Sequence, residues 1–214
     1  MNKKNAITLV LLLLLSLGVN AQKWDELSKT PQMGWSSWNK FQGNIDEEII
    51  KSIADAMVSS GLRDAGYIYV NIDDCWHGKR DSNGFIQADP KHFPHGIKTL
   101  ADYIHARGLK LGIYSDAGSE TCAGRPGSLG HEYQDALQYA RWDIDYLKYD
   151  WCNTININAR GAYQLMSDAL RAAGRPIFFS MCEWGDNNPW RWERDIGNSW
   201  RIWPDIWCSF DSTR

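Results

Sequence analysis

The sequence predicts an α/β fold with parallel strands, and more specifically a (β/α)8 barrel. Short apolar segments alternate six times with amphipathic segments of helical spacing. Charged or polar residues follow nearly every apolar segment, as in barrel enzymes, which build their sites at the carboxyl ends of several strands. The other parallel arrangement, a doubly wound sheet, would concentrate its signal in a GxGxxG turn, and the sequence has none.

Six segments are predicted to be strands because they are short, apolar and rich in aromatic and β-branched residues. They are residues 33–38, 67–74, 109–116, 146–150, 176–184 and 199–205. Because helical segments connect them, the strands are expected to pair in parallel, with the helices outside. Six repeats do not close an eight-stranded barrel, so we expect a barrel portion that lacks its last two strands.

The helical segments carry apolar residues at the spacing of one helix face. In 46–60, Ile50, Ala54 and Met57 share a face, and Gly61 ends the helix. The other predicted helices are 96–107, 131–142, 160–173 and a short one near 189–195.

The first 21 residues are predicted to be a secretory signal peptide. They combine a basic start, an apolar run at 6–18 and a small-residue cleavage pattern at 19–21. A membrane anchor is the alternative, but the run is shorter than the roughly 20 residues that span a bilayer. We therefore expect an exported chain, periplasmic or secreted, with residues 22–214 forming a partial barrel domain and no stable membrane insertion.

Composition excludes some partners and favours others. The net charge is −3, and the sequence has neither a basic run nor a phosphate-binding glycine loop, so nucleic acid is not an expected partner. Five cysteines without CxxC spacing give no zinc signal. Twelve tryptophans favour a sugar ligand where they stand beside charged residues, because flat aromatic faces suit sugar rings. The oligomeric state is left open.

Two charged residues in one strand segment call for an explanation. Lys148 and Asp150 are two positions apart, so both side chains point to the same face, which in a barrel is the interior. A nearby ammonium would keep Asp150 ionised. An ionised, fixed carboxylate is what a nucleophile at an anomeric carbon requires. A purely structural ion pair is the alternative.

A second carboxyl group is needed for glycoside hydrolysis with retention. Asp205 is the candidate, because apolar neighbours in WRIWPD would raise its pKa and keep it protonated; a helix cap is the alternative. Asp73 and Asp74 could accept hydrogen bonds from sugar hydroxyls. A metal-dependent barrel enzyme, with Mg²⁺ on the strand-end carboxylates, is a rival that Lys148 disfavours, since its charge would repel a cation.

Six motifs together resemble glycoside hydrolase family 27, the α-galactosidases. They are TPQMGWSSWN, YIYVNIDDCW, GLKLGIYSDAG, YLKYDWC, SMCEWG and SWRIWPDI, and they run in the family's order from Thr30 to about Ile206. The resemblance implies a retaining mechanism without a metal or other cofactor, acting on terminal α-linked galactose. It implies that Asp150 is the nucleophile and Asp205 the acid/base.

The resemblance also implies sugar contacts and one disulfide bond, between Cys122 and Cys152. The sugar contacts are Trp38, Asp73, Asp74, Tyr114, Lys148, Glu183 and Arg201. Glu183 suits a 2-hydroxyl group, which favours galactose over N-acetylgalactosamine, while β-L-arabinopyranosides are a related alternative. The family's last two strands and C-terminal β-sandwich are not expected in this chain, so an inactive sugar-binding fragment is a further alternative.

Overall fold

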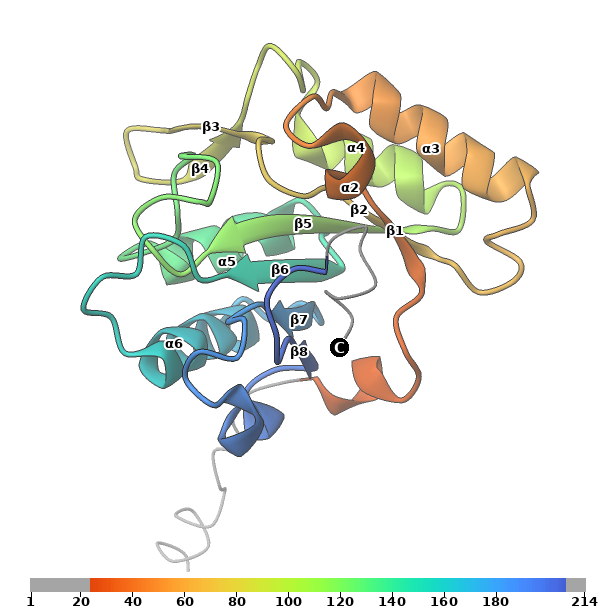
Figure 1. Ribbon diagram of the computed structural model, residues 1–214. Coiled ribbons are helices and arrows are strands. Elements are labelled where there is room, and N and C mark those ends of the chain that lie inside the picture. Colours follow the sequence, from red (N-terminus) through yellow and green to blue (C-terminus); the bar gives the residue numbers. More distant parts are fainter. Residues whose placement is uncertain (1–23, 207–214) are drawn as a thin grey trace, which may run out of the picture.

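The computed structural model describes residues 24–206 and contains the predicted parallel sheet. Its six strands pair in the order β1-β2-β5-β6-β7-β8, and all five pairs are parallel (Figure 1). The strands are β1 (Gly34–Ser36), β2 (Tyr69–Asn71), β5 (Lys110–Asp116), β6 (Tyr146–Asp150), β7 (Phe178–Met181) and β8 (Ser199–Trp200). The sheet curves as part of a (β/α)8 barrel, which confirms the predicted fold class.

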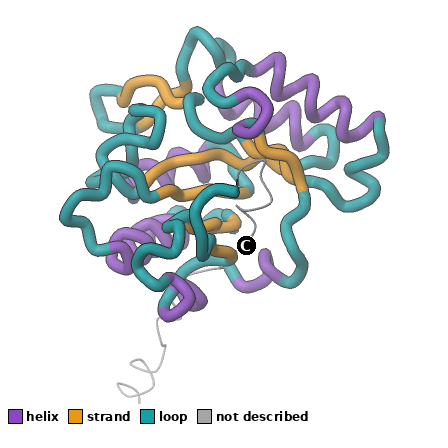
Figure 2. The backbone as a smooth tube through the Cα atoms, in the orientation of Figure 1, coloured by secondary structure: helices purple, strands orange, loops and turns teal. Residues whose placement is uncertain are grey.

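Helices connect consecutive strands of the sheet and lie around its outside (Figures 1 and 2). They are α2 (Trp38–Phe41), α3 (Glu47–Ser59), α4 (Gly96–His105), α5 (Glu132–Arg141) and α6 (Ala159–Ala172). Three short 3-10 helices complete the described elements: η1 (Asp25–Ser28), η2 (Pro189–Arg191) and η3 (Glu193–Asp195). Side-chain caps mark the starts of α3 and α6, where the Asp46 side chain accepts from the Ile49 N–H and the Asn158 side chain from the Gly161 N–H.

A hairpin between β2 and α4 was missed by the sequence reasoning. Strands β3 (His77–Arg80) and β4 (Ile86–Ala88) pair antiparallel beside the main sheet. Asn83-Gly84 is a turn signal, but the flanking segments HGKR and IQA lack the apolar alternation that predicts strands.

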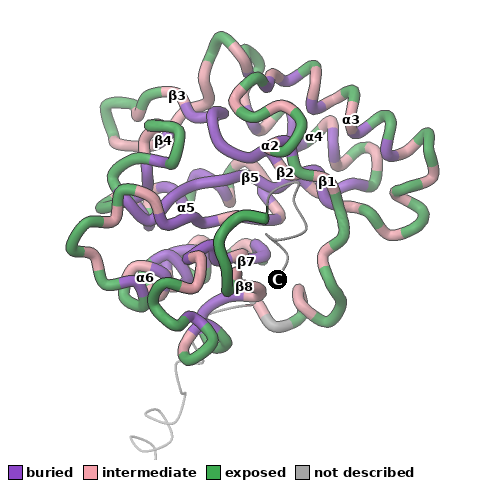
Figure 3. Tube along the Cα trace, in the orientation of Figure 1, coloured by how far each residue is buried: buried purple, intermediate pink, exposed green. Residues whose placement is uncertain are grey.

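The two faces of the strands differ, and this difference positions the site. Leu147 and Tyr149 of β6 pack in the main core against the helices. Tyr146 belongs to a separate cluster with Tyr69 and Phe178, inside the curve of the sheet. Lys148 and Asp150 follow Tyr146 at two-residue steps, so they share this inner face, as predicted. Figure 3 shows how strongly β5 and β6 are buried.

The ends of the sheet depart from the prediction. The segment 33–38 is a strand only to Ser36, and Trp38 begins the short helix α2. The segment 199–205 is a strand only to Trp200, so Asp205 does not end a strand. Both changes occur at the edge strands of the described sheet, which have a hydrogen-bonding neighbour on one side only.

The predicted signal peptide, 1–21, lies outside the described residues. Within residues 24–206, no helix has the length and apolar character needed to cross a bilayer.

Candidate active site

Asp150 lies at the carboxyl end of β6 and is held on both of its carboxylate oxygens. The Tyr114 hydroxyl donates to Oδ2 at 3.0 Å, while the Trp184 indole N–H and the Trp151 backbone N–H donate to Oδ1 at 2.9 and 3.0 Å. The side chain is buried but opens towards the inner face of the sheet. Three donors fix its orientation.

Lys148 forms its ion pair with Asp73 and also interacts with the Asp150 carboxyl. Its Nζ lies 2.9 Å from Asp73 Oδ2 and 5.1 Å from the centroid of the Tyr114 ring. Lys148 thus reaches across β5 from β6 to the end of β2. Burial disfavours its charge, but the carboxylates of Asp73 and Asp150 outweigh this effect and raise the pKa of Lys148. Lys148 therefore remains an ammonium group close to both acids.

Asp74 is fully engaged in holding the loop that follows β5. Its Oδ1 accepts from the Cys75 N–H at 2.6 Å and the Thr121 hydroxyl at 2.9 Å, and its Oδ2 accepts from the Ala123 N–H at 2.9 Å. Burial raises the pKa of Asp74. In this arrangement Asp74 shapes the edge of the site through the loop.

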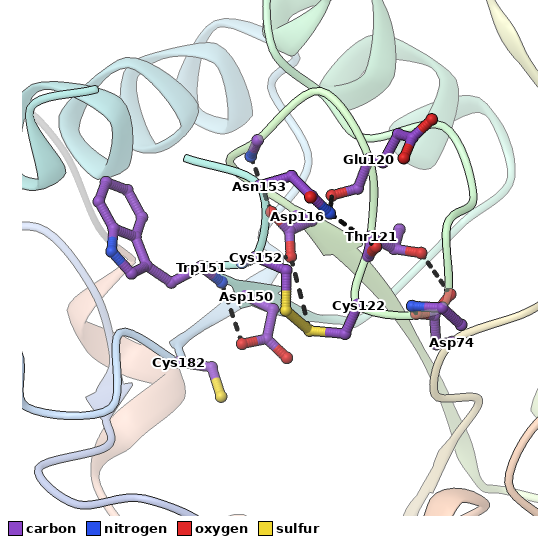
Figure 4. The surroundings of a disulfide bond; sticks show 12 residues. Asp74, Asp116, Glu120, Thr121, Cys122, Asp150, Trp151, Cys152, Asn153 and Cys182 are labelled. Atoms are coloured by element: carbon purple, nitrogen blue, oxygen red, sulfur yellow. Dashed lines mark hydrogen bonds between the residues drawn. A yellow bond between two sulfur atoms is a disulfide. The ribbon is translucent and has the colours of Figure 1, made fainter. Parts of the chain in front are cut away.

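The disulfide bond between Cys122 and Cys152 is confirmed, with the two Cα atoms 5.2 Å apart. It joins the loops after β5 and β6 (Figure 4), and Cys122 Sγ lies 3.2 Å from the Tyr114 hydroxyl oxygen. The two sulfurs lie close to the carboxylates of Asp116 and Asp150, a grouping that could otherwise bind a metal ion. Because the sulfurs are bonded to each other, neither is a thiolate that could act as a ligand.

Asp116 was not among the predicted site residues, although it ends β5 beside Asp150. Its Oδ1 accepts from the Gly118 N–H at 2.7 Å and its Oδ2 from the Cys152 N–H at 2.9 Å. Burial raises the pKa of Asp116 to about 8, and the nearby Asp150 and Asp74 charges contribute. The strand-end pattern had pointed to it, but its role is to anchor the loops that carry the disulfide.

Trp184 is the second residue whose role was missed. It stands beside Glu183 in the sequence, but nothing in the sequence predicts its bond to Asp150. Its backbone φ of 65° lies in the left-handed region, which is uncommon for a residue with a bulky side chain. Such strain clusters at functional sites, where the surrounding structure must maintain it.

Glu183 is buried beneath the 183–188 loop instead of facing open solvent. Its Oε1 accepts from the Asn187 backbone N–H at 2.5 Å and from the Asn187 side-chain amide at 2.6 Å. Burial raises its pKa. Contact with a sugar, as the resemblance implied, would require the loop to shift, because the side chain has no exposed surface in this conformation.

Asp205 and Arg201 lie on the segment after β8. Arg201 Nη1 contacts Asp205 Oδ1 at 2.8 Å, and the Asp205 side chain is 67% exposed. The apolar neighbours in WRIWPD do not bury Asp205: Trp203 is itself 67% exposed, and the strand that was predicted to include both residues ends at Trp200. Trp38 lies half-buried at the end of β1, where the preceding Ser37 hydroxyl accepts from the Asp73 N–H at 2.9 Å.

The structure thus gathers Lys148, Asp73, Tyr114 and the disulfide around Asp150. Arg201 pairs with Asp205 on the segment after β8 and also donates to Cys182 Sγ at 3.4 Å. The chemistry this supports is a fixed carboxyl group beside an ammonium group, a phenol and an indole. Such a set suits a polyhydroxylated ligand and nucleophilic attack on it.

Comparison with known proteins is consistent with this geometry. A family model described as alpha galactosidase A matches residues 30–214. Alpha-galactosidase A of Cellvibrio japonicus is 66% identical over 199 residues, which is 93% of this chain and 49% of the relative. The chain spans about half the length of the curated relatives it matches.

Solved structures give the same result. The crystal structure of alpha-galactosidase I from Mortierella vinacea superposes with a TM-score of 0.84 at 49% identity, covering 86% of this chain and 48% of that one. An α-galactosidase from Saccharomyces cerevisiae, solved with raffinose, superposes with a TM-score of 0.85 at 42% identity. The match covers 89% of this chain and 43% of that one. The chain therefore belongs to the α-galactosidases of glycoside hydrolase family 27.

Proposed function

We propose that the protein carrying this chain hydrolyses terminal α-D-galactosyl residues with retention of configuration. The single observation that carries this proposal is the Asp150 carboxylate, fixed at both oxygens by Tyr114, Trp184 and Trp151. A nucleophile must present one oxygen to the anomeric carbon in a constant direction, and three hydrogen bonds provide that preorganisation. Family membership supplies the reaction class in which such a carboxylate acts.

In the proposed reaction Asp150 attacks the anomeric carbon and Asp205 protonates the leaving oxygen. A covalent galactosyl-enzyme forms, and Asp205 then takes a proton from the water that releases the sugar. Carboxyl groups in retaining enzymes stand about 5–5.5 Å apart. Asp205 is therefore proposed to face Asp150 across the sugar at a separation of about this size.

The remaining inner-face residues are proposed to bind the ring. Lys148 and Asp73 offer a donor and an acceptor within 2.9 Å of each other, which matches neighbouring sugar hydroxyls. Trp38 is proposed as a flat contact for the sugar, Arg201 as a donor and Asp74 as an indirect contributor through its loop. Glu183 is proposed to contact the 2-hydroxyl after movement of its loop.

Oligosaccharides with a terminal α-galactosyl group are the proposed substrates, and raffinose, the ligand of the Saccharomyces cerevisiae relative, is a representative of that class. We also propose that residues 1–21 direct export, that residues 22–214 are barrel-domain sequence, and that neither a metal nor another cofactor takes part.

The test is an assay of the complete natural polypeptide on aryl α-galactoside and aryl β-L-arabinopyranoside, with Asp150→Asn beside it. We expect hydrolysis of the galactoside with retention, and its loss in Asp150→Asn. Preferred cleavage of the arabinopyranoside would overturn the substrate, and full activity of Asp150→Asn would overturn the nucleophile. Loss of activity with a chelator would overturn the metal-free mechanism.

A further inference from the structure

Cys182 lies beside the proposed nucleophile, at the end of the neighbouring strand. Lys148 of β6 is paired with Ser180 of β7. The ladder continues past the end of β7, since the Cys182 N–H donates to the Tyr149 carbonyl at 2.9 Å. Because residues two positions apart share a face, Cys182 lies on the inner face with Ser180, as Asp150 does with Lys148. The side chains of Cys182 and Asp150 therefore lie at the same end of the sheet (Figure 4).

The Cys182 sulfur contacts Arg201, the first residue after β8. Arg201 Nη1 donates to Cys182 Sγ at 3.4 Å, and the same nitrogen lies 2.8 Å from Asp205 Oδ1. The Cys182 side chain is buried, whereas the Asp205 side chain is 67% exposed. One guanidinium group thus joins a buried sulfur beside Asp150 to the exposed carboxyl group of the proposed acid/base.

Arg201 keeps two N–H donors that the rest of the described chain does not use. A guanidinium group carries five N–H donors in a planar, rigid fork. Nε donates to the Trp203 carbonyl at 3.1 Å, and Nη1 contacts Cys182 and Asp205. Within residues 24–206 Nη2 has no hydrogen-bond partner, so it is the part of the group left for a sugar hydroxyl. Because the fork is rigid, the contacts of Nε and Nη1 set the direction of Nη2.

The Cys182 side chain is a neutral thiol at neutral pH. It is 2% exposed and forms no disulfide bond with another described cysteine. Burial, with the Asp150 charge adding to it, raises the pKa of Cys182 to about 12, against the opposing effects of Lys148 and Arg201. A thiol sulfur is a weak hydrogen-bond acceptor. It therefore accepts from Arg201 without adding a negative charge beside Asp150.

We propose that Cys182 is a positioning residue, whose sulfur holds the Arg201 guanidinium at the level of Asp150 and so directs Nη2 towards the sugar. The other described contacts of the guanidinium, with Trp203 and Asp205, are to residues of its own segment. The Cys182 contact is thus the link from the Arg201 side chain to the neighbouring strand. The effect on turnover rests on the proposed function, in which Arg201 donates to the sugar. If Cys182 only filled space, its removal would act independently of Arg201.

The test that needs no activity is a double-mutant cycle in urea unfolding of the full chain, with Cys182→Ala, Arg201→Met and the double variant. Cys182→Ala should lower the ratio of folded to unfolded protein by a factor about threefold to tenfold larger in the wild-type background than in Arg201→Met, which has no donor for the sulfur. Cys182→Ser keeps an acceptor and should retain the coupling. Cys75→Ala, at the other free cysteine of the described chain, is the control and should act equally in both backgrounds. Equal factors for Cys182→Ala in the two backgrounds would overturn the proposal.

The link to turnover is tested by the same cycle in kcat/KM on aryl α-galactoside, with the complete natural polypeptide. Cys182→Ala should lower kcat/KM about threefold to tenfold in the wild-type background and no further in Arg201→Met, with rescue by Cys182→Ser. The dissociation constant of D-galactose, measured on the same four proteins, should follow the same pattern and serves where turnover of Arg201→Met is too slow. Losses of equal size in both backgrounds would overturn the positioning role. A lack of galactosidase activity in wild type would refute the proposed function, while the unfolding cycle still decides the contact.

Discussion

The two proposed catalytic carboxyls occupy contrasting parts of the molecule. Asp150 is 5% exposed at the end of a strand paired on both sides, and three donors hold it. Asp205 follows an edge strand of two residues, and one exposed ion pair with Arg201 holds it. Within the described residues, strand pairing and hydrogen bonds fix the half of the site that carries Asp150, whereas packing does not fix the half that carries Asp205.

The largest expected effect is on catalysis at the rigid half. Asp150→Asn should lower kcat/KM on aryl α-galactoside by at least about 10³-fold, because an amide cannot form the glycosyl intermediate. Steady-state kinetics of the complete natural polypeptide measure this.

The matched control for that variant is Asp64→Asn, whose carboxyl is 69% exposed in the turn after α3. It should leave kcat/KM unchanged. Equal losses in the two variants would show that charge removal in general, rather than the position of Asp150, causes the effect.

The next effect concerns the buried ion pair of the same half. Lys148→Met should lower the free energy of unfolding by about 2 kcal/mol, because it leaves Asp73 buried beside Asp150 without its ammonium partner. This figure is below that of a fully buried pair, since the Lys148 side chain is 28% exposed. Lys98→Met, which breaks a surface pair whose lysine is 44% exposed, should cost less than about 0.5 kcal/mol in the same urea unfolding experiment.

A smaller effect is expected from the indole that contacts the nucleophile. Trp184→Phe removes the N–H donor to Asp150 but keeps an aromatic ring, so kcat should fall about tenfold while the free energy of unfolding changes little. Trp190→Phe, at a 53% exposed tryptophan in η2, is the control and should leave kcat unchanged. If Trp184→Phe and Trp190→Phe had the same kcat, the hydrogen bond from Trp184 to Asp150 would not contribute to catalysis.

The same contrast explains what the sequence could predict. Strand β6 has the predicted bounds because its alternation of inner and outer residues is regular, and this placed Lys148 and Asp150 on the inner face. The partner of Lys148 could not be read from that alternation, because Asp73 belongs to a strand two places away in the sheet. Only the three-dimensional curve of the sheet brings them together.

Conformational features were also beyond the sequence. The left-handed backbone at Trp184 turns its indole towards Asp150, and no sequence signal announces a tryptophan in that region. The last strand was predicted too long because SWRIWPD has the composition of a strand. Strand length at a sheet edge depends on a neighbour that pairs with it, and composition does not supply that information.

The smallest expected effect is on stability at the exposed half. Asp205→Asn should change the free energy of unfolding by less than about 0.5 kcal/mol, because an ion pair whose carboxyl is 67% exposed gains little over hydration. The same variant should nevertheless lower kcat/KM by at least about 10²-fold, since the acid/base proton is lost.

A stability loss near that of Lys148→Met would mean that Asp205 is packed in the complete polypeptide, and the two halves would then be equally preorganised. Small losses of both stability and kcat/KM in Asp205→Asn would exclude Asp205 as the acid/base partner of Asp150, because a carboxyl that does not contribute to turnover cannot be the acid of a retaining pair.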